Sequence, residues 1–112
     1  MNFPSHVRMY LCVAPTDMRK QMNGLSIAVR EGMGRDPRSG EMFVFRNRRA
    51  DMMRVLFFDQ QGYCLLSKRL ERGVFDVAFQ SDLDASSIEL NAAQLANLLA
   101  GIRIDTRGNV AA

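Results

Sequence analysis

The 112-residue chain is long enough for one domain that buries roughly two-thirds of the surface its unfolded chain would expose, so it needs no disulfide or metal to fold. No apolar run approaches the roughly 18 residues of a membrane span, and the first residues lack a secretory signal, which excludes a membrane protein and predicts a cytoplasmic one. The net charge is only +3, and the two cysteines, Cys12 and Cys64, are expected to be buried free thiols.

The first third of the chain predicts a strand followed by one long helix. Residues 7–13 alternate apolar and polar side chains, as in a strand with one buried face. Thr16 can serve as an N-cap, and apolar residues then recur at spacings of three and four as far as Met33. This spacing predicts a helix over residues 16–33, within which Gly24 indicates a close neighbour or a bend.

After Glu41 the apolar period changes to two. Four segments, 42–46, 52–59, 63–70 and 74–79, resemble strands, and the links between them are short enough for antiparallel hairpins. They predict a four-stranded meander.

Near the C-terminus, residues 91–100 predict a second helix. Asn91 and Gln94 have the spacing of a capping box, and Gly101 follows where the helix would end. Residues 103–112 contain little that could pack. We therefore expect one globular domain over residues 1–102 and a flexible tail over 103–112.

These elements predict an α+β fold, an antiparallel β-meander with one long N-terminal helix packed on it and a short C-terminal helix. Phe43, Phe45 and Phe57 share an alternation that predicts packing against the helices rather than base stacking. An open meander leaves two edges, and residues 74–79 carry only Asp76 as a protecting charge. A homodimer formed through an edge strand or an apolar patch is therefore a further expectation.

Positive charge is concentrated in the meander. Residues 42–72 hold seven basic and three acidic side chains, whereas residues 73–112 hold two basic and five acidic ones. Most of the cations are arginines, whose planar fork suits phosphate or carboxylate and favours a nucleic-acid or acidic protein partner. A solvated face with internal ion pairs is the alternative. The predicted DNA-binding surface comprises Arg46, Arg48, Arg49, Arg54, Lys68, Arg69 and Arg72, helped by Arg19 and Lys20 at the start of the first helix.

Two hairpin registers are open for this surface. A three-residue loop sets Arg54 opposite Lys68, and a two-residue loop at residues 61–62 sets it opposite Arg69. In either case two cations face each other and need a counter-charge. A phosphate is one candidate, and the other is Asp76, which the meander would place beside Lys68.

Three stretches closely resemble the small accessory protein, of the TnpB type, that bacterial insertion sequences of the sixty-six family carry. They are TDMRKQMNGL (16–25), FVFRNRRADMMRVLFFDQQGYCLLSKRLERGVF (43–75) and LANLLAGI (95–102). The similarity covers roughly residues 3–102, with Gln21 and Phe58 as small departures. It implies a role in transposition alongside a separate, larger transposase and another small protein, with the DNA of the element ends as an expected partner.

The residues do not predict an enzyme. Neither lysine follows an acidic residue by two positions, so the acid-x-lysine triplet of restriction-type nucleases is absent from the sequence. Asp51, Asp59 and Asp76 have no spacing that forces them to converge on metal ions. One histidine and two distant cysteines do not supply a zinc site, and no cofactor is expected.

Two functions remain open. The first is a non-catalytic accessory protein that binds DNA with little sequence preference through the basic hairpins. The second is a protein-interaction module that docks on the transposase without direct contact to DNA.

Overall fold

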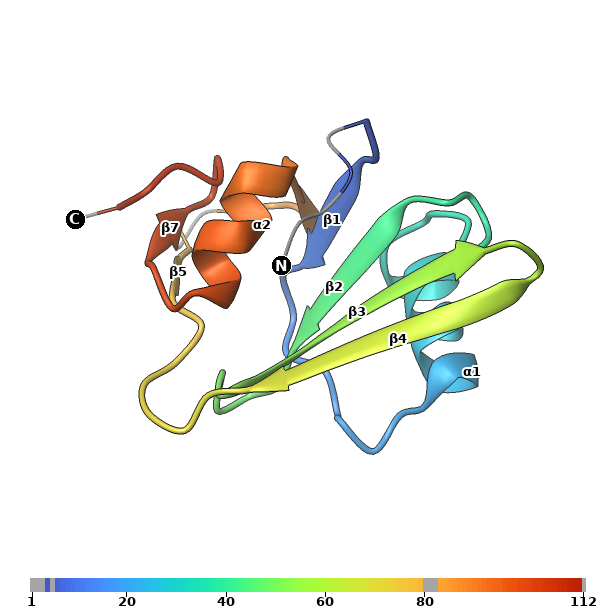
Figure 1. The fold of residues 1–112 in the computed structure, drawn as a ribbon, viewed down its shortest axis with the longest axis horizontal. Helices are drawn as coiled ribbons and strands as arrows, with labels where there is room; N and C mark the ends of the chain where they lie inside the picture. Colours follow the sequence, from blue (N-terminus) through green and yellow to red (C-terminus); the bar gives the residue numbers. More distant parts are fainter. Residues whose placement is uncertain (1–3, 5, 80–82, 112) are drawn as a thin grey trace.

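The structure is a computed structural model that describes residues 4, 6–79 and 83–111 (Figure 1). Five strands form one sheet in the order β4-β3-β2-β1-β6, and two more form a small parallel pair. Strands β1 and β2 are parallel and are joined through α1, while the other neighbours in the sheet are antiparallel. The elements in chain order are β1 (Met9–Cys12), α1 (Met22–Ile27), the π-helical segment η1 (Ala28–Gly32), β2 (Met42–Arg46), β3 (Met52–Asp59), β4 (Gly62–Arg69), β5 (Val77–Ala78), β6 (Ser87–Leu90), α2 (Ala92–Leu99) and β7 (Ile104–Asp105). The α+β class with a mostly antiparallel sheet is confirmed.

Each face of the sheet has its own core. On one face, Leu25 of α1 and Val29 of η1 pack against Phe43 and Phe45. Both phenylalanines are fully buried, which confirms that they are core residues. On the other face, α2 and the β5–β7 pair cover the sheet, with Leu95 among the fully buried side chains. Successive side chains of β2 point to opposite faces of the sheet, so β2 contributes buried side chains to both cores.

The prediction of one long helix over residues 16–33 is wrong. The helix begins at Met22, and α1 and η1 together end at Gly32. Thr16 is not the N-cap, because the helix begins six residues later with Gln21 as its N-cap. The N–H of Thr16 instead donates to the carbonyl of Arg46 at 2.8 Å and holds Thr16 beside the end of β2. The wider turn of η1 continues α1, whose N-cap residue Gln21 makes no side-chain capping bond. Tertiary pairing thus shortened a helix that its apolar spacing favoured.

The fourth strand of the predicted meander is also wrong. Of residues 74–79, only Val77 and Ala78 form a strand, and this β5 pairs in parallel with β7 outside the main sheet. Asp76 consequently lies away from Lys68 and forms an ion pair with Arg103 at 3.4 Å. The meander contains three strands, β2, β3 and β4.

Neither predicted hairpin register is correct. The loop is Gln60–Gln61, so Asp59 pairs with Gly62 and Arg54 pairs with Ser67. Both glutamines have positive φ, at 46° and 73°, which is the conformation of a type I′ turn that matches the twist of the strands. Glycine is usual at such positions, so the sequence favoured a loop containing Gly62. Arg54 consequently has no cation directly opposite it.

The segment after Ile102 does have a residue to pack. Ile104 is fully buried in the core beneath α2, and β7 pairs with β5. Gln94 of α2 donates from Nε2 to the carbonyl of Arg107 at 3.1 Å, so residues 103–111 lie against α2 rather than outside the domain. The expectation that little packs beyond Ile102 is therefore wrong.

Replacing Gly108 by alanine tests this docking. The φ of Gly108 is +81°, and a Cβ there would lie 2.6 Å from the Gln94 side chain, so the free energy of unfolding should fall by about 1–3 kcal/mol. Gly73→Ala is the matched control, because φ is +78° there but no atom lies within 4 Å of the added Cβ. Urea unfolding followed by circular dichroism measures both. Both variants carry the strain of a positive φ, so a Gly108→Ala variant that loses no more stability than Gly73→Ala would show that the segment is not docked on Gln94.

Candidate nucleic-acid interface

The loop between β2 and β3 presents two arginines. The side chain of Asn47 donates from Nδ2 to the Asp51 carboxylate at 2.6 Å. The backbone carbonyl of Asn47 accepts the N–H of Ala50 at 3.0 Å. Ala50 has a φ of 59°, which closes the loop tightly. Arg48 and Arg49 occupy its tip and are exposed. Hydrogen bonds within the loop therefore fix the backbone that carries both guanidinium groups.

A second loop, residues 70–76, is tied to the first through backbone hydrogen bonds. The N–H of Leu70 donates to the carbonyl of Asp51 at 2.8 Å, and the N–H of Phe75 donates to the carbonyl of Ala50 at 2.6 Å. Phe75 is fully buried and anchors the end of this loop in the core. Arg72 lies between these two anchors and is exposed.

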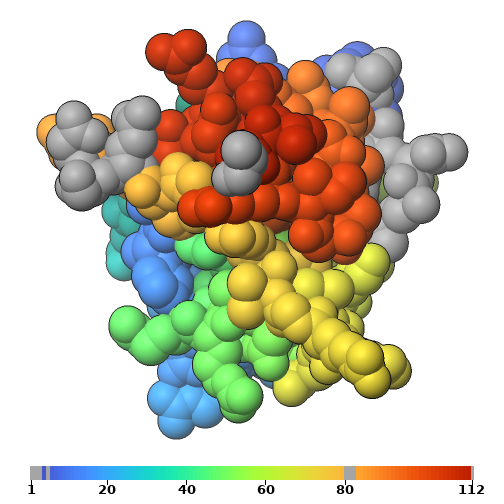
Figure 2. Space-filling view, turned by 90° about the vertical axis from the view of Figure 1, so that its left-hand side faces the viewer, coloured from blue at the N-terminus to red at the C-terminus, as the bar shows by residue number. Residues whose placement is uncertain are grey.

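The two loops and the end of β4 form what we call the basic end of the sheet. Figure 2 shows it in the lower half of the molecule, where green residues of the β2–β3 loop lie between blue residues before α1 and yellow residues after β4. Within the described part of the chain, its cations make no ion pair within 4.0 Å. They are Arg48, Arg49, Lys68, Arg69 and Arg72, all exposed.

Asp51 is the acidic residue at the centre of the basic end. Its pKa is lowered chiefly by the hydrogen bond from Asn47 and further by the charges of Arg49 and Arg69. It therefore stays ionised at neutral pH and offsets only part of the local positive charge.

Lys20 joins the basic end across a hollow of about 630 Å³. The hollow separates residues 15–20 from the β2–β3 loop, and Lys20, Arg48 and Arg49 all line it. The pairing of Thr16 with Arg46 holds the two sides together. Lys20 therefore lies across this hollow from Arg48 and Arg49, and it precedes the helix instead of lying on it.

Arg19 is engaged by its neighbour. Its guanidinium donates to the Asp17 carboxylate, with Nη2 at 2.6 Å from Oδ2. This side-chain bond, followed by the backbone N–H of Arg19, lowers the pKa of Asp17 to about 2. The charge of Arg19 is therefore neutralised within its own turn.

Arg46 and Arg54 are structural rather than exposed. Arg54 donates from Nη1 to the carbonyl of Lys20 at 2.8 Å and so ties the stretch before α1 to β3. Arg46, on the other face of the sheet, lies 4.9 Å from the ring centroid of Phe79 and donates to the carbonyl of Phe75 at 3.4 Å. Burial lowers the pKa of Arg46. Sequence alone could not separate these two from the exposed arginines, since all occupy the same basic stretch.

The hairpin register separates the remaining strand cations. Lys68 pairs with Met53 and lies on the face covered by α2, whereas Arg69 pairs with Met52 and lies on the face covered by α1. Both are at the same end of β4, so the basic end continues around the edge of the sheet.

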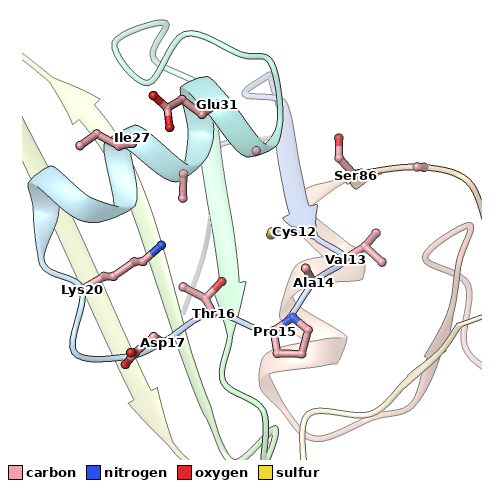
Figure 3. A pocket seen from close by; sticks show the side chains of 13 residues that line it. Cys12, Val13, Ala14, Pro15, Thr16, Asp17, Lys20, Ile27, Glu31 and Ser86 are labelled. Carbon is pink, nitrogen blue, oxygen red and sulfur yellow. The ribbon is translucent and has the colours of Figure 1, made fainter.

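A second hollow, of about 530 Å³, lies between α1 and the end of β1 (Figure 3). Cys12 lines it, and burial raises the pKa of its thiol, so the reactive thiolate is disfavoured. Lys20 and Glu31 reach its rim. Among residues 4, 6–79 and 83–111, no group of three or more His, Cys, Asp or Glu side chains is placed to hold a metal ion. In the same residues, no helix has the length and apolar character needed to cross a membrane.

The chain belongs to the family described as IS66 Orf2 like protein, whose model matches residues 7–109. It is 37 % identical over 97 residues to the uncharacterized protein y4hO of Sinorhizobium fredii, covering 87 % of this chain and 82 % of that protein. It is 39 % identical over 69 residues to the uncharacterized protein y4jC of the same organism, covering 62 % of this chain and 59 % of that protein. No solved structure matches. Membership of this family suggests an accessory role in the transposition of insertion sequences.

Removing the partner of Asp17 should restore an ordinary pKa. In Arg19→Ala, the pKa of Asp17 should rise from about 2 toward 3.8, because both the side-chain bond and the charge are lost. Stability from this pair is present above the unfolded pKa and is lost as the pH falls through about 2. Carboxyl NMR titration checks the shift, with Arg30→Ala as the control. An unchanged pKa would mean that Arg19 is free in solution.

The structural role of Arg54 gives a second prediction. Arg54→Met should lower the free energy of unfolding by about 1.5–3 kcal/mol, because a charged donor to the Lys20 carbonyl is lost. Arg48→Met, at the exposed loop tip, should stay within about 0.5 kcal/mol of the parent. Urea unfolding compares the two. Equal effects would contradict the division into structural and exposed arginines.

Proposed function

We propose that this protein is a non-catalytic accessory factor of transposition that binds the phosphate backbone of DNA through its basic end. One observation carries the proposal. The two hydrogen bonds that join Leu70 and Phe75 to the β2–β3 loop gather exposed cations from both loops at one place. Membership of the family supports a role in transposition, and the positive charge of the basic end supports DNA as the partner.

The cations of the basic end suit phosphate. Arginine forms bidentate, charge-assisted hydrogen bonds with phosphate oxygens, and Arg48 and Arg49 sit on a fixed loop that loses little conformational freedom on binding. Lys20 and Arg72 flank this loop on its two sides. A phosphate chain passing over the loop would therefore meet positive charge along its path.

Little sequence preference is expected, because the cations lie on loops and a strand end. None of the cations of the basic end lies on α1, η1 or α2. Direct readout commonly places a helix in the major groove, and none of these segments carries the basic end. Contacts to phosphate position a protein on DNA without reading its sequence.

Salt dependence tests the proposal. Neutralising about three to five phosphates should make log affinity fall with log salt at a slope of roughly −3 to −4.5. Replacing Arg48 and Arg49 together by alanine should flatten this slope by up to about 2 units, with folding nearly unchanged. Fluorescence polarisation against element-end and random duplexes measures both.

The matched control is the Arg30→Ala, Arg107→Ala double variant, which removes the same charge from exposed positions outside the basic end. This variant should bind DNA nearly as tightly as the parent, because only the overall net charge is reduced. If the Arg48, Arg49 variant binds DNA as the parent does but no longer associates with the transposase, the basic end is a protein-docking surface and the DNA proposal is wrong. Titrations with and without transposase distinguish the two.

A further inference from the structure

Strand β4 is an outer strand of the sheet with a long, regular edge. Its eight residues all pair with β3, without a bulge, and no described segment pairs with its other side (Figure 1). The opposite outer strand, β6, has only four residues and carries Glu89, which is paired with Arg8 at 3.7 Å. Its short length and its charge protect β6 against pairing with another chain. Strand β4 is long and carries charge only at its C-terminal end, so it is less protected.

The hairpin turn determines which backbone groups of β4 are unpaired. In a two-residue loop at Gln60–Gln61, the N–H of Gly62 points toward Asp59. Backbone groups in an antiparallel ladder alternate, so those of Tyr63, Leu65 and Ser67 point away from β3. The edge therefore presents a row of donors and acceptors at alternate residues.

The side chains beside this edge are apolar over its first half. Residues 62–66, GYCLL, are uncharged and half-buried, while residues 67–69 are exposed and end in two cations. Leu65 packs beside the core under α1, and Leu66 beside the core under α2. Both cores thus end at β4 with apolar side chains that are only partly covered.

We propose that a second copy of this chain pairs with β4 edge to edge, antiparallel, about a two-fold axis at Leu65. The distribution of charge along the strand selects this occupant. Antiparallel pairing sets Lys68 beside Gly62 of the other copy and Ser67 beside Tyr63, so the cationic half of each strand meets the neutral half of its counterpart. A parallel arrangement would set Lys68 and Arg69 beside their own counterparts. The two-fold arrangement also closes the assembly at two copies, because each β4 edge is used up.

The dimer would have one continuous ten-stranded sheet. Since the two β4 strands run in opposite directions, the two basic ends would lie at opposite ends of that sheet. Each dimer would then have two separate surfaces for DNA, and this statement rests on the proposed function. The pairing itself requires no DNA.

The test is amide hydrogen exchange by NMR, in dilute and concentrated protein without DNA, together with light scattering. The amides of Tyr63, Leu65 and Ser67 should become slower to exchange as the concentration rises, in step with the appearance of a dimer. The amides of Cys64 and Leu66, which point toward β3, should be protected at both concentrations. Fast exchange of the outward amides in the concentrated sample overturns the proposal, whether the protein is monomeric there or dimerises through another face.

Ser67→Pro provides the matching variant. It removes an outward N–H from an edge strand, where proline is tolerated, and should abolish the dimer. Ser67→Ala keeps the N–H and should dimerise like the parent. A dimeric, folded Ser67→Pro protein overturns the proposal, and the exchange experiment on the parent decides it if the variant does not fold. A monomeric parent that still binds DNA would leave the proposed function standing.

Discussion

Two backbone hydrogen bonds, from Phe75 to Ala50 at 2.6 Å and from Leu70 to Asp51 at 2.8 Å, hold together the two loops of the basic end. They turn the chain after β4 across the end of the sheet and keep residues 74–79 out of it. The left-handed conformation of Ala50, with φ of 59°, belongs to the same tight loop that supplies both acceptors. Burial of Phe75 stabilises the arrangement, because a fully buried aromatic side chain contributes about 1.5–3 kcal/mol.

The arginines of the central stretch serve two different purposes as a result. Arg46 and Arg54 lie half-buried on opposite faces of the sheet, where their guanidinium groups hold neighbouring loops through backbone carbonyls. Each guanidinium donates from Nη1 to a backbone carbonyl, but its buried Nε has no hydrogen-bond partner, so the cost of burying these two groups is only partly offset. Arg46 holds the loop that carries Arg72, and Arg54 holds the stretch that ends at Lys20. These two half-buried cations therefore help to position two of the exposed ones.

Elements that depend on interactions between residues close in sequence could be predicted from the sequence alone. The capping box of Asn91 and Gln94 is present as expected, because both of its hydrogen bonds join residues three apart. The strands β2, β3 and β4 followed from their period-2 patterns.

Where distant segments compete, the sequence was not sufficient. Thr16 looked like an N-cap, but a bond to Arg46, thirty positions further along the chain, holds it beside the end of β2. The hairpin register depended on two glutamines adopting positive φ, a conformation for which their side chains give no signal. Gln94 completes its capping box and also binds the carbonyl of Arg107, which fixed a segment that composition alone described as a tail.

In the proposed function, two loops distant in sequence form one DNA-binding surface. Amide and arginine side-chain shifts in ¹⁵N-labelled protein, recorded during titration with a short duplex, test it most directly. We expect the shift changes to cluster on residues 47–51 and 68–73 and to decrease as salt is added, while the shifts of residues 30–38 and 103–111 stay unchanged. Shifts confined to one loop, or centred away from both, would contradict it.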